Sequence, residues 1–173
     1  MLVALSDTHG RESPRLEGRT KAAVEAADLV VHAGDFATGA VLDAFAARSD
    51  LRGVYGNNDP PAVRDRLPAE RVVEWADLRL FVVHGHEHTD TTLAMAGRQS
   101  NADLVVYGHS HDPGVRTGEV PLCNPGSHAD PRWNRPGHAE LEWDEVAELA
   151  RGRLVEPSGE TFERFVVEPQ PVE

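Results

Sequence analysis

The stretch Leu2-Val-Ala-Leu-Ser-Asp-Thr-His9 decides the fold, because the apolar strand Leu2–Leu5 runs directly into a carboxylate and an imidazole. Four more apolar strands end in the same way, on short polar segments that contain glycine. In an α/β sheet the carboxyl ends of the strands meet at one rim, where ligands bind. We therefore expect five segments to deliver Asp, Asn and His side chains to one place. The other four are Leu29–His32 before Gly34-Asp35, Leu51–Tyr55 before Gly56-Asn57-Asn58-Asp59, Leu78–Val83 before His84-Gly85-His86, and Leu104–Tyr107 before Gly108-His109-Ser110-His111.

The segments between these strands predict α/β layering through residue 107, with a largely parallel first sheet. Helices are expected over Arg15–Ala27, Val41–Ala47 and Thr91–Ser100, with a helical turn over Val63–Leu67 and a hairpin of Val72–Trp75 and Leu78–Val83. Beyond Gly108 the pattern becomes β-rich, and 173 residues fit a single domain, 1–173. The later strands expected are Gly114–Thr117, Val120–Cys123, Ala139–Trp143, Arg153–Glu156 and Phe162–Val167, with a short helix over Asp144–Arg151 and a long, functional loop over Asn124–Gly137.

The residue types that follow the strands suit a metal centre. Imidazole, carboxylate and amide oxygen are ligands for Mn²⁺, Fe, Zn²⁺, Co²⁺ or Ni²⁺, and the single Cys123 excludes a thiolate site. Taken one at a time, an Asp or His after a strand is as often a helix cap or a turn former. Five such segments in order favour a ligand set, and the number of donors suits two ions about 3.5–4 Å apart with one bridging carboxylate.

The ordered set D-x-H, G-D, G-N-x-D, H-G-H and G-H-x-H resembles the calcineurin-like metallophosphoesterase superfamily, and its small bacterial and archaeal phosphodiesterase branch matches best. The retromer scaffold subunit is a relative of that branch. The resemblance spans Leu2 to Ser127, and the Asn124-Pro-Gly-Ser127 loop is also similar. It implies an α/β fold in which two facing β-sheets form a sandwich with helices outside.

The resemblance also implies roles for the motif residues. Asp7, His9 and His111 would bind one metal ion, Asn57, His84 and His109 would bind the other, and Asp35 would bridge them. A metal-bound hydroxide would then attack phosphorus in line, which makes the chain a metal-dependent phosphoesterase, with a phosphodiester of a small molecule as the expected substrate and Mn²⁺ as the expected metal. The residues expected to take part in catalysis are Asp35, Asn57, Asn58 and His86.

Asn58 marks a departure from many larger superfamily members, which carry a histidine at this position. An amide cannot act as an acid, so the group that protonates the leaving oxygen is left open.

Other polar residues near the motifs carry weaker expectations. His86 is expected near the substrate and His88 in an exposed loop, while His32 is expected to be hydrogen-bonded and structural. For His128, substrate contact and solvent exposure stay open. Arg132 and Arg135 could clamp a phosphate or pair with surface carboxylates, and Trp133 could anchor its loop or stack on an aromatic substrate group.

Composition narrows the function classes. The net charge is −12, and Lys21 is the only lysine among 17 basic residues. This composition fits a GC-rich genome, a salt-rich cytoplasm, or both. An acidic chain argues against a large nucleic-acid footprint. With no apolar run long enough to span a membrane, a cytoplasmic enzyme is expected, with a homo-oligomer left open. A non-catalytic interaction scaffold and a nuclease remain the alternative functions.

Overall fold

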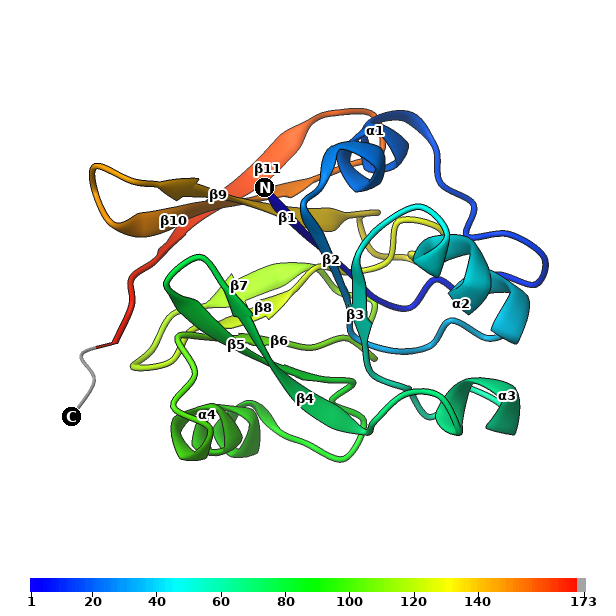
Figure 1. Ribbon diagram of the computed structural model, residues 1–173, viewed down its shortest axis with the longest axis horizontal. Coiled ribbons are helices and arrows are strands. Elements are labelled where there is room, and N and C mark those ends of the chain that lie inside the picture. Colours follow the sequence, from blue (N-terminus) through cyan, green and yellow to red (C-terminus); the bar gives the residue numbers. More distant parts are fainter. Residues whose placement is uncertain (171–173) are drawn as a thin grey trace.

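The computed structural model describes residues 1–170, and they form two β-sheets with four helices around them (Figure 1). The six-stranded sheet has the order β11-β10-β9-β1-β2-β3, and the five-stranded sheet has the order β4-β5-β6-β8-β7. The elements are β1 (Leu2–Leu5), α1 (Gly18–Ala26), β2 (Leu29–His32), α2 (Gly39–Ala46), β3 (Leu51–Gly53), α3 (Pro61–Arg64), β4 (Glu70–Trp75), β5 (Leu78–Val83), α4 (Asp90–Gln99), β6 (Leu104–Val106), β7 (Gly114–Arg116), β8 (Leu122–Asn124), β9 (His138–Asp144), β10 (Leu149–Val155) and β11 (Thr161–Val167).

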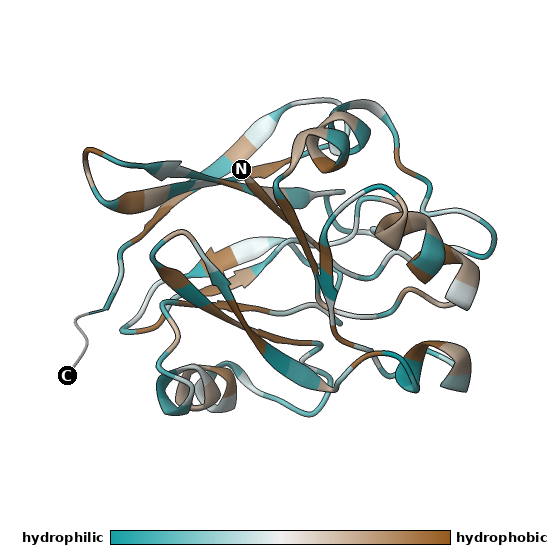
Figure 2. Cartoon of the chain, in the orientation of Figure 1, coloured by the Kyte–Doolittle hydropathy of each residue, from teal (hydrophilic) through white to brown (hydrophobic). Residues whose placement is uncertain are grey.

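The predicted sandwich of two facing sheets with helices outside is confirmed. One hydrophobic core lies between the sheets and contains Leu2 and Ala4 of β1 together with Leu80 of β5 and Leu104 of β6. A second core packs the outer face of the six-stranded sheet against α1 and α2, and a third packs the five-stranded sheet against α4. Because β1 and β2 are covered on both faces, they are apolar along their length (Figure 2).

The strand directions bring the motif segments to one rim. β1 pairs in parallel with β2, and β2 pairs in parallel with β3. In the other sheet, β5 pairs in parallel with β6. The predicted largely parallel first sheet therefore holds for β1, β2 and β3, while β9, β10 and β11 extend that sheet with antiparallel pairing.

The predicted short helix over Asp144–Arg151 is wrong. Asp144 ends β9, and its side chain accepts the backbone amides of Val146 and Ala147, which builds a turn instead of a helical start. Extended β10 follows, and buried Ala150, Gly152 and Leu154 alternate along it with the period of a strand. The strand predicted over Arg153–Glu156 is only the second half of this longer element.

The first helix begins at Gly18, three residues later than predicted. Arg15 has a φ of 49° and Gly18 a φ of 48°, so the backbone before the helix leaves the right-handed region twice. The second helix begins at Gly39, earlier than predicted, because Thr38 caps it by accepting the amide of Val41. The α4 bounds differ from the prediction by one residue at each end.

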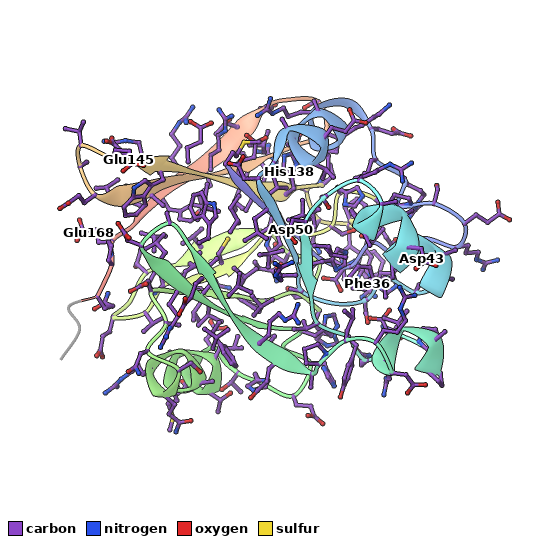
Figure 3. All side chains as sticks on the ribbon, viewed as in Figure 1. Phe36, Asp43, Asp50, His138, Glu145 and Glu168 are labelled. Atoms are coloured by element: carbon purple, nitrogen blue, oxygen red, sulfur yellow. The ribbon has the colours of Figure 1, made fainter. Side chains whose placement is uncertain are left out.

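A buried ionic cluster fixes α1 to the six-stranded sheet, and we call it the Glu140 cluster. Glu140 of β9 accepts hydrogen bonds from Arg19 of α1 at 2.7 and 2.6 Å and from Arg153 of β10 at 3.1 and 2.6 Å. His138 lies 2.9 Å from the same carboxylate through Nε2, and its Nδ1 meets Thr20 of α1 at 3.0 Å (Figure 3). In this cluster both carboxylate oxygens and both ring nitrogens have partners.

No helix within residues 1–170 has the length and apolar character needed to cross a bilayer.

Candidate metal centre

The segments after β1, β2, β3, β5 and β6 meet at the rim where the two sheets approach each other. Asp7 donates its backbone N–H to Gly34 O at 2.9 Å, and His9 donates its own to Asp35 O at 3.1 Å, so the first two segments are joined directly. His109 of the five-stranded sheet donates its backbone N–H to Asp7 Oδ2 at 2.9 Å. The rim is therefore built from both sheets, and the structure brings all seven predicted ligands together.

Asp7, His9 and His111 form the first group of donors. The Asp7 side chain is fully buried, and its Oδ1 lies 3.4 Å from His111 Nε2 and 3.9 Å from His9 Nε2. The two imidazole rings stack with centroids 5.0 Å apart. The Nδ1 of His111 bonds to Asp130 O, which leaves Nε2 to face Asp7.

Asn57, His84 and His109 form the second group. Asn57 Oδ1 lies 3.0 Å from His84 Nε2 and 3.2 Å from His109 Nδ1. The other nitrogen of His84, Nδ1, lies 2.8 Å from Ala33 O, which fixes the orientation of the ring.

Asp35 lies between the two groups. Its Oδ2 is 3.4 Å from His9 Nε2 of the first group and 3.3 Å from His84 Nε2 of the second. Burial alone would raise the pKa of Asp35, but His84 and two donors of Asn58 outweigh it and lower the pKa. Burial likewise favours neutral His84, yet Asp35 and Asp7 raise the pKa of its ring.

One donor atom of each residue in the first group lacks the partner that a buried polar atom normally has. Asp7 Oδ1, His9 Nε2 and His111 Nε2 are buried without a hydrogen bond among residues 1–170. Two sets of side chains, Asp7 with His9 and His111, and Asp7 with Asp35 and His84, each have ligand atoms within 4.8 Å of one another. Carboxylate and imidazole donors aimed at one another across such distances fit divalent cations.

Five of the seven candidate ligands have a left-handed backbone. The φ angles are 51° at Asp7, 45° at His9, 61° at Asp35, 72° at His109 and 58° at His111. Such angles are uncommon outside glycine, although Asp and His are enriched among the exceptions. The backbone therefore turns sharply after β1, β2 and β6, where these five residues lie.

Several residues that hold the ligands in place had no predicted role. Asp59 accepts the amides of Gly56 and Asp35 through Oδ2 and of Ala37 through Oδ1, at 2.8–2.9 Å, so it joins the segments after β2 and β3. Its position inside the G-N-x-D motif was the only signal for it in the sequence. Ser6 donates its hydroxyl to Asp7 Oδ2 at 2.8 Å, and nothing in the sequence distinguishes this serine from a surface one.

The predicted functional loop after β8 braces the rim. Asn124 donates its side-chain amide to Gly108 O at 3.2 Å and to Ser110 Oγ at 2.9 Å. Ser127 donates its hydroxyl to Asp7 O at 2.6 Å and accepts the amide of Asp130 at 2.8 Å. The loop thus holds the segments that carry Asp7, His109 and His111.

Asn58 faces Asp35. Its backbone N–H donates to Asp35 Oδ1 at 2.9 Å and its side-chain amide donates to Asp35 Oδ2 at 2.7 Å. Both contacts orient the carboxylate.

His86 is exposed at the rim, with its ring centroid 5.5 Å from that of His84 and 6.2 Å from that of His109. Burial, although partial, lowers the pKa of His86. A role at the substrate stays a prediction.

Three further histidines can be placed. His32 is hydrogen-bonded to Thr8 Oγ1 at 2.8 Å and accepts the amide of Gly34, so its predicted structural role is confirmed. His88 is half-buried, because its turn folds back so that its amide donates to Gly85 O, and the prediction of an exposed residue is wrong. His128 is buried with Nε2 2.8 Å from Pro14 O, so it is neither exposed nor open to a substrate.

The contacts and exposure of three loop residues, Arg132, Trp133 and Arg135, decide between some of their predicted roles. Arg135 pairs with Glu156 at 3.0 Å and lies over the Phe162 ring, which confirms the carboxylate-pairing alternative for it. Arg132 is exposed. Trp133 is 92% exposed, so it does not anchor its loop. Stacking against a substrate is the alternative that stays a prediction for Trp133.

The comparison with protein families decides the identity of the fold. The model of the calcineurin-like phosphoesterase superfamily domain matches residues 1–145. The chain belongs to this superfamily.

Relatives of this chain are found among archaeal proteins. A probable metallophosphoesterase of Methanocaldococcus jannaschii is 30% identical over 110 residues, which cover 61% of this chain and 55% of that protein. A phosphodiesterase of the same organism is 30% identical over 115 residues, covering 59% of this chain and 68% of the relative. The chain therefore spans little more than half the length of the first of these relatives.

Solved structures share the fold across nearly the whole chain. A predicted phosphoesterase of Streptococcus pneumoniae has a TM-score of 0.75 at 24% identity, with 95% of this chain and 96% of that chain covered. Wild-type Vps29 of Entamoeba histolytica, complexed with zinc, has a TM-score of 0.75 at 18% identity, with 95% and 98% covered. At these identities the likeness establishes the fold alone.

Proposed function

We propose that this chain is a metal-dependent phosphoesterase that hydrolyses a small-molecule phosphate ester, preferably a phosphodiester, at a centre of two divalent ions. One observation carries the proposal: buried carboxylate and imidazole atoms from both sheets converge on the rim without hydrogen-bond partners of their own. Buried polar atoms are normally satisfied. A metal centre needs carboxylate and imidazole atoms that face one another and make no other hydrogen bonds.

In this proposal Asp7, His9 and His111 hold one ion, Asn57, His84 and His109 hold the other, and Asp35 contacts both. The position of Asp35 Oδ2, between His9 and His84, supports the bridging role. Mn²⁺ is the proposed metal, with Fe, Zn²⁺, Co²⁺ or Ni²⁺ as alternatives for the same donors. When bound, such ions supply positive charge for the phosphoryl oxygens and make a water acidic near neutral pH.

The chain's own residues orient this chemistry. Asn58 holds both oxygens of Asp35 and so fixes the carboxylate plane. Because an amide cannot act as an acid, a proton for the leaving oxygen has to come from water or from another group such as His86, the exposed histidine of the rim. Exposed His86 and His109 border the side of the centre that is open to solvent, which leaves room for an ester of a small molecule.

The proposal extends to domain organisation. The family match ends at residue 145, but β10 and β11 continue the six-stranded sheet by pairing with β9, which itself pairs with β1. We therefore treat residues 1–173 as one domain.

Two other functions compete with hydrolysis. A non-catalytic scaffold with this fold has no need for the donor set, yet all seven donors are retained and converge. A nuclease needs a basic surface for the phosphate backbone, whereas this chain carries a net charge of −12. Both features favour a small-molecule phosphoesterase.

The test is metal reconstitution followed by a substrate panel. Protein stripped of metal and loaded with Mn²⁺ should bind about two ions per chain and hydrolyse activated phosphodiesters faster than the matching monoesters. Elemental analysis measures the first result and release of the chromophore the second. A protein that binds no more than one ion and hydrolyses neither class would leave the scaffold as the better function. Titration with single- and double-stranded DNA at several salt concentrations tests the nuclease.

A further inference from the structure

Arg64 grips the backbone of the segment that carries Asn57 and Asn58. Its Nε donates to Asp59 O at 2.7 Å, and its Nη2 donates to Asn57 O at 2.7 Å. Asn58 lies between these two carbonyls in the sequence, so the guanidinium brackets it. Arg64 is the last residue of α3, and this short helix follows the loop directly (Figure 1).

The bracket is specific to arginine. A guanidinium offers several N–H groups in a rigid plane, which lets one side chain bond two neighbouring carbonyls at once. The ammonium of a lysine is a point charge on a flexible stem and does not reproduce this fork. Stacking adds to the restraint, because the Arg64 guanidinium carbon lies 5.3 Å from the centroid of the Tyr55 ring, just before the same loop.

The segment Asn57–Asp59 makes two sets of contacts, one through its backbone carbonyls to Arg64 and one to the residues of the rim. At the rim Asn57 Oδ1 meets His84 and His109, and the backbone and side-chain amides of Asn58 meet Asp35. Asp59 completes the frame by accepting the Gly56 amide. The position of Asn57 Oδ1 therefore depends on Arg64, although Arg64 is not itself a candidate ligand.

We propose that Arg64 is a positioning residue for the second metal ion, the one assigned to Asn57, His84 and His109. The proposal rests on the dinuclear centre of the proposed function and adds a selective role within it. In the first group Asp7 is held instead by Ser6 and Ser127, and His111 by Asp130. Asn58 of the same segment also orients Asp35, which is assigned to both ions. Loss of Arg64 should therefore weaken the second ion more than the first. Partners that orient metal ligands typically contribute 10–100-fold to metal affinity.

The experiment is a calorimetric titration of metal-free protein with Mn²⁺, comparing wild type, Arg64→Ala, Arg64→Lys and Arg66→Ala. Arg66 is the matched control, because it is an exposed arginine two residues away that pairs with Asp43 at 2.6 Å and does not touch the loop (Figure 3 labels Asp43). Arg64→Ala should weaken one of two Mn²⁺ sites by about tenfold or more, with a smaller loss at the other, which shares only Asp35 with the bracketed loop. Arg64→Lys should restore little of this loss, and Arg66→Ala should match wild type.

Amide hydrogen exchange of the metal-free proteins gives a second reading that does not depend on metal. The Asn58 amide should exchange faster in Arg64→Ala than in wild type or Arg66→Ala, since the loop is no longer bracketed. Two unchanged Mn²⁺ affinities, or weakening of both sites by the same factor, would overturn the selective role. If wild type itself binds fewer than two ions, the dinuclear function fails. In that case unchanged exchange at Asn58 would reject the bracket as well, and faster exchange would retain it as a loop restraint.

Discussion

The rim and the Glu140 cluster are built from the same kinds of side chain but are satisfied differently. Each places buried carboxylate beside imidazole at the meeting point of distant segments. In the Glu140 cluster two arginines and a threonine saturate every polar atom of Glu140 and His138. At the rim Asp7 Oδ1, His9 Nε2 and His111 Nε2 have no hydrogen-bond partner in the part of the chain that the structure describes. The contrast teaches that the burial of charge alone is not a sign of function, whereas burial with aligned and unsatisfied donors is.

The largest expected effect comes from changing Asp35, the residue common to both groups at the rim. Asp35→Asn should weaken both ions and reduce hydrolysis by more than about 100-fold, which exceeds the effect typical of a residue that only orients a ligand. Elemental analysis and steady-state rates measure the two results. His88→Ala, half-buried and outside both groups, should change little. Full activity in Asp35→Asn with one bound ion would contradict a dinuclear centre.

The second effect concerns the leaving group. Because the amide of Asn58 cannot act as an acid, the rate should depend steeply on leaving-group pKa, and aryl esters should be cleaved far faster than alkyl esters. A placed general acid typically contributes 10²–10⁴-fold, so Asn58→His should flatten the dependence if its ring reaches the leaving oxygen. The same variant loses the 2.7 Å contact with Asp35, so metal affinity has to be measured beside the rate.

His86→Ala is the control for that experiment. If it steepens the dependence on leaving-group pKa, His86 already donates the proton in the wild-type protein. A wild-type rate that is indifferent to leaving-group pKa, with chemistry rate-limiting, would show that another acid is present.

The third effect is the pH dependence of the free energy of unfolding. His128 is buried outside both regions, and its Nε2 lies 2.8 Å from Pro14 O. Burial lowers its pKa from 6.5 to about 4. Between these values the unfolded chain binds more protons than the folded one, so stability is lost as the pH falls, by about 3 kcal/mol. Denaturant melts from pH 7 to 4 should show a shallower decline for His128→Gln, and an equally steep one would mean that other groups dominate.

The fourth effect tests the saturated cluster. Glu140→Gln removes a buried charge from two arginines whose side chains are 35% and 33% exposed, so water offsets part of the loss. The free energy of unfolding should fall by about 2 kcal/mol, less than for a fully buried pair. Chemical denaturation measures this change. Mn²⁺ binding at the rim should remain as in wild type, and a parallel loss of metal would show that the two regions are not independent.

The smallest effect concerns the exposed charges outside both regions. If the net charge of −12 reflects a salt-rich cytoplasm, lowering KCl from molar to about 0.1 M lengthens the screening distance from about 3 to about 10 Å and increases self-repulsion. The melting temperature should then fall. A melting temperature that stays constant would favour the GC-rich genome as the origin of the composition.

The sequence predicted what neighbouring residues determine. The apolar run Leu2–Leu5 was recognisable as a buried strand, and Asp7 and His9 as polar residues at its end. The sequence did not reveal contacts between residues that are far apart along the chain. Arg64 looked like any surface arginine, and the Glu140 cluster joins Arg19, Glu140 and Arg153 from three elements. The helix expected over Asp144–Arg151 failed because Asp144 forms a turn with its own neighbours.

The left-handed backbone of the rim has a further consequence for the stability of this protein. Each of the five rim residues with a positive φ lowers the stability of the fold relative to glycine, by about 1 kcal/mol in the usual case. Replacing a ligand by glycine deletes a donor and relaxes the chain in the same step. Glycine at one of these positions should therefore raise the stability of the fold while it removes a donor from the rim, so the two properties are opposed at the same residue.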